Sequence, residues 1–260
     1  MNFEEITSRD NKSLKLAVKL QNSKTRKETS LFVLEGLRLC RDAACNGYRI
    51  ETIFATRGFY EKNPEVTEEI SEIANKTYII DSELFLKISD TKSPQGIACI
   101  CKIPENSCEV CGNGKYIVLE DTQDPANLGA IARTAEAMGI SGILVSSRGC
   151  DPFSPKAQRA AMGALLRLPI IRTYNLYMML QNLKDKGFVL YATVIDDTAE
   201  LLSNIMFEDS CVMLIGNEAN GLTKQAIALC NRKITIPMRG KAESLNAAAA
   251  AAVIIWEMTK

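Results

Sequence analysis

Apolar runs alternate with polar, glycine- or proline-marked loops in the C-terminal part of the chain. Cys211 to Ile215 is apolar and leads into Gly216-Asn-Glu-Ala-Asn-Gly221, and Ile234 to Met238 leads into a polar loop before the alanine-rich segment that starts at Leu245. Short apolar runs bounded by turn residues predict buried strands, and the alanine-rich segment predicts a helix. Ligands of parallel α/β sheets bind outside the carboxyl ends of the strands. We therefore expect a ligand site at these loops.

The pattern over residues 1–103 predicts a smaller α/β domain, because strands and helices alternate along it. Ser82 is the expected N-cap of its last helix. Ser23 to Thr29 is polar and basic, which predicts a loop. The expected strands cover residues 31–36, 50–55, 78–80 and 95–103, and the expected helices cover residues 11–21, 37–46, 61–75 and 83–89.

Residues 104–114 break this pattern with proline, glycine and polar residues, which predicts a linker. Residues 115–260 form the second expected domain, which is mostly parallel α/β. Arg133 lies six residues after Asn127 on an expected helix over 127–138, nearly two turns on, so the two side chains are expected to face the same side. The remaining expected strands cover residues 116–120, 142–147, 168–171, 188–195, 211–215 and 234–238, and the remaining helices cover residues 154–163, 175–186, 223–230 and 245–258.

The composition is that of a soluble globular protein. With 260 residues, 47% of them apolar, the chain can bury a real core in one large or two modest domains. Its nine cysteines are too few and too scattered for a disulfide scaffold, and no charged and apolar leader precedes them, so we expect the reducing cytoplasm. The longest apolar run, residues 247–256, is shorter than the ~20 residues that cross a bilayer, so no membrane span is expected.

Charge is balanced overall, with 31 basic and 31 acidic residues, so total charge does not indicate a nucleic-acid partner. The basic residues are nevertheless concentrated near the N-terminus, which favours either a phosphate-contacting edge or a solvated helix face. The candidate RNA-binding residues are Arg9, Lys12, Lys15, Lys19, Lys24, Arg26 and Lys27.

Metal chemistry receives little support. The sequence has no histidine, which removes the commonest metal ligand and the commonest general base. Cys99, Cys101, Cys108 and Cys111 could suggest zinc, but the first two lie in an apolar strand and the spacing does not repeat as paired Cys-x-x-Cys knuckles. We expect free buried cysteines and no metal.

Nucleotide-binding motifs are also missing. Gly216 to Thr223 has the glycine spacing of a phosphate-binding loop, but Leu222 stands where the lysine is required. No Gly-x-Gly-x-x-Gly follows an expected strand, so a Rossmann dinucleotide site is unsupported. One such polar loop alone is most simply ordinary turn chemistry, because glycine and asparagine supply positive φ. Three polar loops, each at a strand end, favour a site for a neutral or zwitterionic ligand.

Three segments carry a resemblance to a known family. Residues 121–135 (DTQDPANLGAIARTA), residues 214–222 (LIGNEANGL), and residues 234–238 (ITIPM) with residues 244–249 (SLNAAA) resemble, in order, the three motifs of the SpoU (TrmH) branch of the SPOUT RNA methyltransferases. The motifs span the second expected domain. The first hundred residues resemble, more loosely, the substrate-binding domain of the same family, through residues 32–36 (FVLEG) and 93–98 (SPQGIA). That domain is similar to a ribosomal-protein type of RNA-binding α/β/α fold.

The resemblance implies a parallel sheet with a C-terminal trefoil knot, an exception to the rule that chains are unknotted. It implies S-adenosylmethionine as cofactor, methyl transfer to a ribose 2′-hydroxyl of RNA, and a homodimer in which two chains complete each site. Carried over residue by residue, the implied catalytic positions are Asn127, Arg133, Glu218, Ser244 and Asn246. The implied cofactor-binding positions are Gly216, Ile236 and Leu245, with Thr193, Asn217, Gly221 and Met238 nearby.

The proton of the hydroxyl must leave, and the candidate acceptors are Arg133, Glu218 and an RNA phosphate. A guanidinium with a pKa above ~12 is a poor base, so we expect Arg133 to position the ribose and its phosphate. Its alternative role is a surface ion pair with Glu136. Ribosomal RNA is the expected substrate, transfer RNA is the alternative, and a non-catalytic RNA-binding or assembly factor is the alternative from another class.

Overall fold

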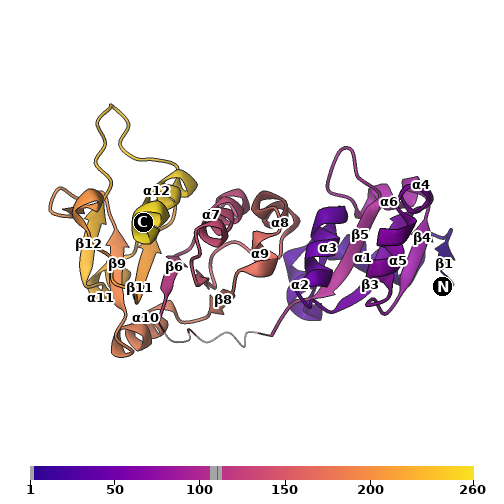
Figure 1. Ribbon diagram of the computed structural model, residues 1–260, viewed down its shortest axis with the longest axis horizontal. Coiled ribbons are helices and arrows are strands. Elements are labelled where there is room, and N and C mark those ends of the chain that lie inside the picture. The colour runs from indigo at the N-terminus through magenta and orange to yellow at the C-terminus, as the bar shows by residue number, and fades with distance from the viewer. Residues whose placement is uncertain (1–2, 106–109, 111–112) are drawn as a thin grey trace. The chain divides into compact units, whose positions relative to one another are not determined.

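The structure is a computed structural model that describes residues 3–105, 110 and 113–260. The chain divides into two compact units, the first made of residues 1–105 with 153–159 and the second of residues 106–152 with 160–260 (Figure 1). Cys108 and Cys111 of the zinc hypothesis, and most of the expected linker, lie outside the described residues.

The first unit is built on a five-stranded mixed sheet in the order β1-β4-β3-β5-β2. β1, β4 and β3 are parallel, while β5 is antiparallel to both β3 and β2. Its core is an apolar cluster of α1, α6 and the sheet, with Leu14, Phe54 and Phe85 almost fully buried. The strands are β1 (Glu4–Ile6), β2 (Leu31–Glu35), β3 (Ile50–Thr56), β4 (Thr77–Ile80) and β5 (Ile97–Lys102), and the helices are α1 (Lys12–Lys19), α2 (Ser23–Thr29), α3 (Leu37–Cys45), α4 (Arg57–Lys62), α5 (Pro64–Ser71) and α6 (Ser82–Ile88).

Three local expectations for this unit are wrong. Residues 23–29 form α2 rather than a loop, because Asn22 caps the helix by accepting a hydrogen bond from the Lys24 N–H. The helix expected over 61–75 is two helices, because Pro64 begins a new one and Asn63 is non-helical. Asp81, rather than Ser82, stands at the N-cap of α6.

The second unit is a seven-stranded sheet in the order β10-β12-β9-β11-β6-β7-β8, and every pair in it is parallel. α12 packs against α7 (Figure 1). The strands are β6 (Lys115–Leu119), β7 (Gly142–Ser146), β8 (Ile170–Thr173), β9 (Val189–Thr193), β10 (Glu200–Leu201), β11 (Cys211–Ile215) and β12 (Arg232–Thr235), and the helices are α7 (Pro125–Ala137), α9 (Ala164–Arg167), α10 (Leu176–Asp185), the short η1 (Leu202–Asn204), α11 (Lys224–Leu229) and α12 (Ala247–Thr259). One further helix, α8 (Pro155–Ala161), belongs to the first unit up to residue 159. The expected mostly parallel α/β architecture is confirmed.

Candidate active site

Three neighbouring strands of the second unit end at the same edge of the sheet. In the strand register, Thr193 at the end of β9 lies beside Ile234 of β12, and Ala192 lies beside Leu214 of β11. Because the strands are parallel, Thr193, Gly216 and Ile236 emerge together at the carboxyl edge. The Thr193 hydroxyl donates a hydrogen bond of 2.8 Å to the Leu214 carbonyl, which ties β9 to β11 at this edge.

The loop after β11 is a tight turn. The Asn217 and Gly221 backbones exchange hydrogen bonds of 3.1 and 2.9 Å, and the Asn217 side chain donates to the Asp121 carbonyl at 2.8 Å. A Cβ at Gly216 would lie 2.2 Å from the Gly221 carbonyl carbon, so a side chain at this position has no room. Gly221 has a φ of +65°, the left-handed conformation that glycine adopts freely. The side chain of Asn217 and both glycines therefore shape the loop.

The Glu218 carboxylate binds the start of α7. It accepts hydrogen bonds from the Gln123 N–H at 3.0 Å, the Asp124 N–H at 3.3 Å and the Asn127 side-chain amide at 2.8 Å. Burial by itself raises the pKa of Glu218, but the hydrogen bonds from Gln123, Asn127 and Asp124 hold the pKa below its ordinary value. The resulting carboxylate is a weak proton acceptor, and it sits at the positive end of the α7 dipole.

A second hydrogen bond extends this connection to α12. The Asn246 amide donates to the side-chain oxygen of Asn127 at 3.1 Å, and the Asn246 oxygen accepts from the N–H groups of Ala248 and Ala249 as the N-cap of α12. Asn127 is 8% exposed, so its hydrogen bonds to Glu218 and Asn246 lie inside the protein. Asn246, Asn127 and Glu218 therefore form one hydrogen-bonded chain across the three motifs.

Arg133 does not join this chain. Asn127 is buried and Arg133 is exposed on α7, so the expectation that the two face the same side is wrong. Six residues of an α-helix correspond to about 240° of rotation, because each residue turns by roughly 100°. Glu136 pairs with Arg167 at 2.8 Å, and Arg133 has no ion pair or hydrogen bond from its side chain within the described residues. Its guanidinium is free to bind a partner from outside the chain. Ser244 is likewise exposed.

Backbone donors at the carboxyl edge fit a ligand such as S-adenosylmethionine. The N–H groups of Ile236 and Met238 after β12, and of Leu245 before α12, bond to no other group in the described part of the chain. Leu245 is 40% exposed, and Ile236 and Met238 are half-buried. Donors of this kind can read the adenine and the amino-acid part of the cofactor by hydrogen bonds.

Sequence reasoning missed one supporting group beneath the loop. Glu120 follows β6, is 3% exposed, and accepts hydrogen bonds of 2.8 Å from both the N–H and the hydroxyl of Thr223. These bonds hold the start of α11, and so the end of the loop after β11, against β6. An acid directly after an apolar strand was the available signal.

Most of the candidate RNA-binding residues are exposed on or near α1 and α2, and Lys15 pairs with Asp10 at 2.6 Å. Arg26 is a correction, because it is 3% exposed and donates to the carbonyls of Leu20 and Gln21 at 2.7 and 2.9 Å. It satisfies carbonyl groups at the C-terminal end of α1 and presents no guanidinium to a partner.

The cysteines of β5 are fully buried, and the sulfurs of Cys99 and Cys101 lie 3.5 Å apart. A hydrogen bond with Cys101 and burial raise the pKa of Cys99 well above its ordinary value, which disfavours the thiolate that metals need. The described residues include no group of three or more acidic or cysteine side chains placed to hold a metal ion. Nor is any helix among them long and apolar enough to span a bilayer.

Comparisons with known proteins identify the family. The model of the SpoU rRNA Methylase family matches residues 114–256, and the model of the MRM3-like substrate binding domain matches residues 11–99. The chain is 28% identical to the 23S rRNA (guanosine(2553)-2′-O)-methyltransferase RlmP of Bacillus subtilis, over 98% of this chain and 99% of that protein. It is 31% identical to an uncharacterized tRNA/rRNA methyltransferase of Synechocystis sp., over 97% of this chain and 92% of that protein.

The fold agrees with this. The structure of an AdoMet-bound rRNA methyltransferase from Sinorhizobium meliloti matches with a TM-score of 0.88 and 28% identity, over 98% of this chain and 97% of that one. The resemblance seen in the sequence is confirmed, as is the expected α/β architecture with a C-terminal SPOUT domain. The chain belongs to the SpoU rRNA methylase family, which includes S-adenosylmethionine-dependent RNA 2′-O-methyltransferases.

Proposed function

We propose that the protein is a cytoplasmic homodimer that methylates a ribose 2′-hydroxyl of 23S ribosomal RNA, with S-adenosylmethionine held in a knotted C-terminal segment. The observation that carries the proposal is the chain Asn246–Asn127–Glu218, which joins one residue of each family motif within hydrogen-bond distance. The full-length relative from Bacillus subtilis, named for this reaction, supports the choice of ribosomal RNA.

The cofactor supplies an electrophilic methyl group on a sulfonium. The reaction forms an oxygen–carbon bond to the ribose, breaks the sulfur–carbon bond and releases the hydroxyl proton. The main task of the protein is alignment, and positioning alone can contribute up to about 7–11 kcal/mol. The free N–H groups of Ile236, Met238 and Leu245 are proposed to hold the cofactor, at a carboxyl edge fixed by the turn from Gly216 to Gly221.

Glu218 is proposed to act as a positioning residue. Its oxygens accept three hydrogen bonds from the α7 start, and its pKa is low for the reason given above, so it is poorly suited to take the proton. That leaves an RNA phosphate, or water next to it, as the acceptor. Arg133 is proposed to bind that phosphate and the ribose through charge-assisted hydrogen bonds.

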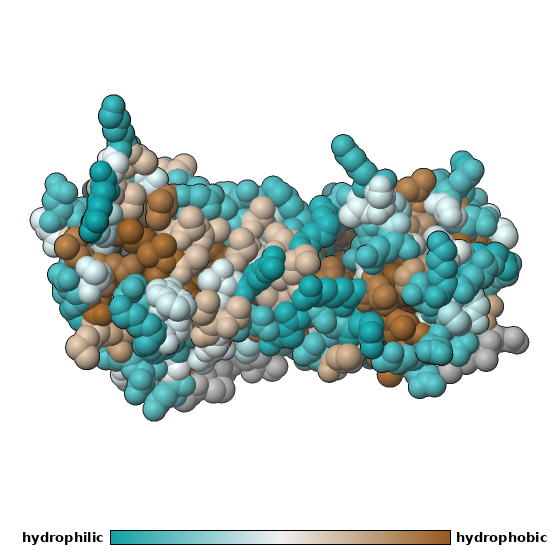
Figure 2. Space-filling model, turned by 45° about the horizontal axis from the view of Figure 1, so that its top comes forward, coloured by the Kyte–Doolittle hydropathy of each residue, from teal (hydrophilic) through white to brown (hydrophobic). Residues whose placement is uncertain are grey.

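A second copy of the protein explains why Arg133 does not join the hydrogen bonds among Asn246, Asn127 and Glu218. Leu245, Val253 and Trp256 are exposed at 40%, 42% and 57%, and Figure 2 shows hydrophobic residues gathered over the end of the second unit where α12 lies. An exposed apolar face on a terminal helix suits a protein–protein contact. In the proposed dimer, Arg133 of one copy completes the site that Asn246, Asn127 and Glu218 of the other copy form.

The test mixes two inactive variants. Arg133→Ala and Asn246→Ala are each expected to lose methyl transfer to 23S ribosomal RNA from cells that lack the protein. When the two are unfolded, mixed and refolded together, dimers with one intact site should recover activity to about a quarter of the wild-type value, because half of the random dimers are mixed and each holds one site. Arg133→Ala should still bind S-adenosylmethionine in calorimetry.

The outcomes separate the parts of the proposal. No recovery with stable dimers would place Arg133 in the site of its own chain. No methyl transfer by the wild-type protein to ribosomal RNA, together with transfer to transfer RNA, would overturn the substrate. A dimer that binds no S-adenosylmethionine would instead favour an RNA-binding factor without catalysis.

A further inference from the structure

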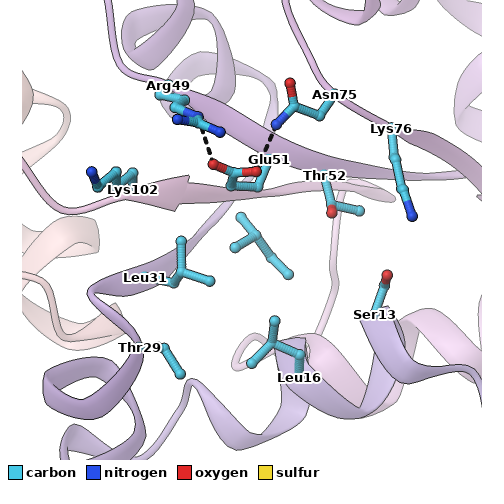
Figure 3. Close-up of a pocket in the computed structure, with 11 residues that line it drawn as sticks. Ser13, Leu16, Thr29, Leu31, Arg49, Glu51, Thr52, Asn75, Lys76 and Lys102 are labelled. Carbon is cyan, nitrogen blue, oxygen red and sulfur yellow. Dashed lines mark hydrogen bonds and ion pairs between the residues drawn. The ribbon is translucent and has the colours of Figure 1, made fainter.

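The first unit contains a cavity that the methyl-transfer site does not use. It has a volume of about 510 Å³, within the range of ~300–1,000 Å³ typical of small-ligand pockets. It opens at the edge of the sheet where β3 and β4 begin, β2 begins and β5 ends, beside α1 (Figure 3). We propose that this cavity receives one unstacked nucleotide of the RNA substrate. This inference rests on the proposed function, since it takes RNA to be the substrate.

The floor of the cavity is apolar. Leu16 of α1 and Leu31 of β2 are half-buried there, and Ile100 of β5 is 1% exposed. Figure 3 shows the Leu16 and Leu31 side chains directed into the same space. An apolar floor suits the face of a nucleobase, which has little affinity for water compared with its edges.

The hydroxyl of a mostly buried threonine faces this space and is open to it. Thr52 of β3 is 6% exposed, and its hydroxyl makes no hydrogen bond within the described residues. The register of β3 against β5 shifts between Ile50 and Thr52, a bulge of the kind that re-aims side chains next to binding sites. Because this hydroxyl has no partner within the described chain, it is available to donate to or accept from a ligand in the cavity. Ser13 of α1 lines the cavity opposite Thr52 (Figure 3). Two hydroxyls can read the polar edge of a base.

One rim of the cavity carries a flat, fixed cation. The Arg49 guanidinium donates to Glu51 at 2.7 Å, and Glu51 also accepts from the Asn75 amide at 2.6 Å (Figure 3). The Arg49 side chain is nevertheless 65% exposed, so the plane of its guanidinium is held in place while a face remains open. Guanidinium planes stack on bases that RNA presents outside its helices.

The other rim charges are positive. Lys76 precedes β4 and forms no ion pair in the described chain, and Lys102 has only a loose, exposed contact with Glu105 at 3.4 Å. The residues that line the cavity therefore include three cations, Arg49, Lys76 and Lys102, and one carboxylate, Glu51, around an apolar floor. That combination matches a nucleotide, which has an apolar face, a polar edge and a phosphate. The exposed lysines of α1 extend the basic surface beyond Ser13 along the same helix.

The test uses the full-length protein and a 23S ribosomal RNA transcript that contains 4-thiouridine. Photo-cross-linking followed by mass spectrometry should find adducts on the peptides that carry Thr52, Lys76 or Lys102. Thr52→Val keeps the side-chain shape and removes only the hydroxyl, so it should fold at least as stably while RNA binding weakens roughly two- to tenfold. Lys76→Glu should weaken binding and lower the dependence of the dissociation constant on salt by about one phosphate contact.

Lys62→Glu is the matched control, because it makes the same change of charge at another exposed lysine. Lys62 ends α4, which follows the end of β3 that lies opposite the cavity. It should bind RNA more tightly than Lys76→Glu. Thr52→Val and Lys76→Glu that bind like the wild-type protein, with no adduct on the three peptides, would overturn the inference. Methyl transfer by the wild-type protein is measured in parallel. Its absence would count against the proposed function, whereas RNA binding and the adducts decide the pocket in either case.

Discussion

The side-chain amide of Asn246 donates a hydrogen bond to the side-chain oxygen of Asn127 at a distance of 3.1 Å, although the two residues are 119 positions apart. Asn246 is the N-cap of α12, and Asn127 lies in the first turn of α7. Because Asn127 also donates to Glu218, hydrogen bonds between side chains connect the three motifs.

Asn246→Asp separates the two tasks of this residue. Aspartate keeps the oxygen that caps α12 but cannot donate to Asn127, so we expect near wild-type stability and at least tenfold slower methyl transfer. Asn246→Ala should also lose the cap, which lowers the free energy of unfolding by about 0.5–2 kcal/mol. Urea unfolding and a methyl-transfer assay measure both effects. Wild-type activity in Asn246→Asp would show that the donated bond is dispensable.

Glu218→Gln should flatten the dependence of stability on acid pH. The pKa of Glu218 is lowered in the folded protein, so its stabilising effect is present above its ordinary value of 4.5 and is lost as the pH falls through the lower folded value. The effect is small because the side chain is exposed to screening by water. The measurement is urea unfolding at several pH values on either side of 4.5.

Glu243→Gln is the control for this prediction, because Glu243 is an exposed acid that makes no hydrogen bond or ion pair in the described structure. It should follow the wild-type curve. If Glu218→Gln follows that curve as well, the three hydrogen bonds to Glu218 contribute nothing to stability.

Gly216→Ala should disrupt the proposed cofactor loop. The new methyl would lie 2.2 Å from the Gly221 carbonyl carbon, so the paired backbone of Asn217 and Gly221 must move. We expect binding of S-adenosylmethionine in calorimetry to weaken more than tenfold. Gly240→Ala meets nothing within 4 Å and should bind the cofactor normally. Equal affinities for the two variants would contradict the assignment of this loop.

Arg26→Gln should reduce stability rather than RNA affinity. Two carbonyls at the end of α1 lose a charged donor, and each such bond contributes about 1.5–3 kcal/mol at most. We expect a loss of about 2 kcal/mol in the free energy of unfolding. The neighbouring Lys27→Gln should leave stability unchanged, because Lys27 is exposed. Chemical unfolding and RNA binding on the same samples distinguish the effects, and weaker RNA binding by folded Arg26→Gln would contradict this role.

The sequence alone predicted the main strands of the second unit and the polar loops after them, although it did not predict β10, and β12 ends at Thr235 rather than at Met238. Cys211 to Ile215 is apolar and Gly216 to Gly221 is rich in turn residues, and both signals act over a few neighbouring residues. The order of the three motifs along the chain also identified the family, because the chemistry of one site determines which residue types the motifs contain. Local capping was harder to predict, as α2 shows, since Ser23 to Thr29 has no apolar residue and is helical through its cap and Arg26.

Tertiary structure decided which side chains meet. Asn127 and Arg133 share a helix, but packing of α12 against α7 buries the first and leaves the second exposed. In the same way, Arg26 has the side-chain type expected of an RNA contact, but its guanidinium binds two carbonyl groups inside the protein. The sequence therefore determines which segments are strands, helices and loops, because hydrophobic period and turn chemistry are local. Helix orientation and the bonds among Asn246, Asn127 and Glu218 depend on segments about a hundred residues apart, which only the packed fold brings together.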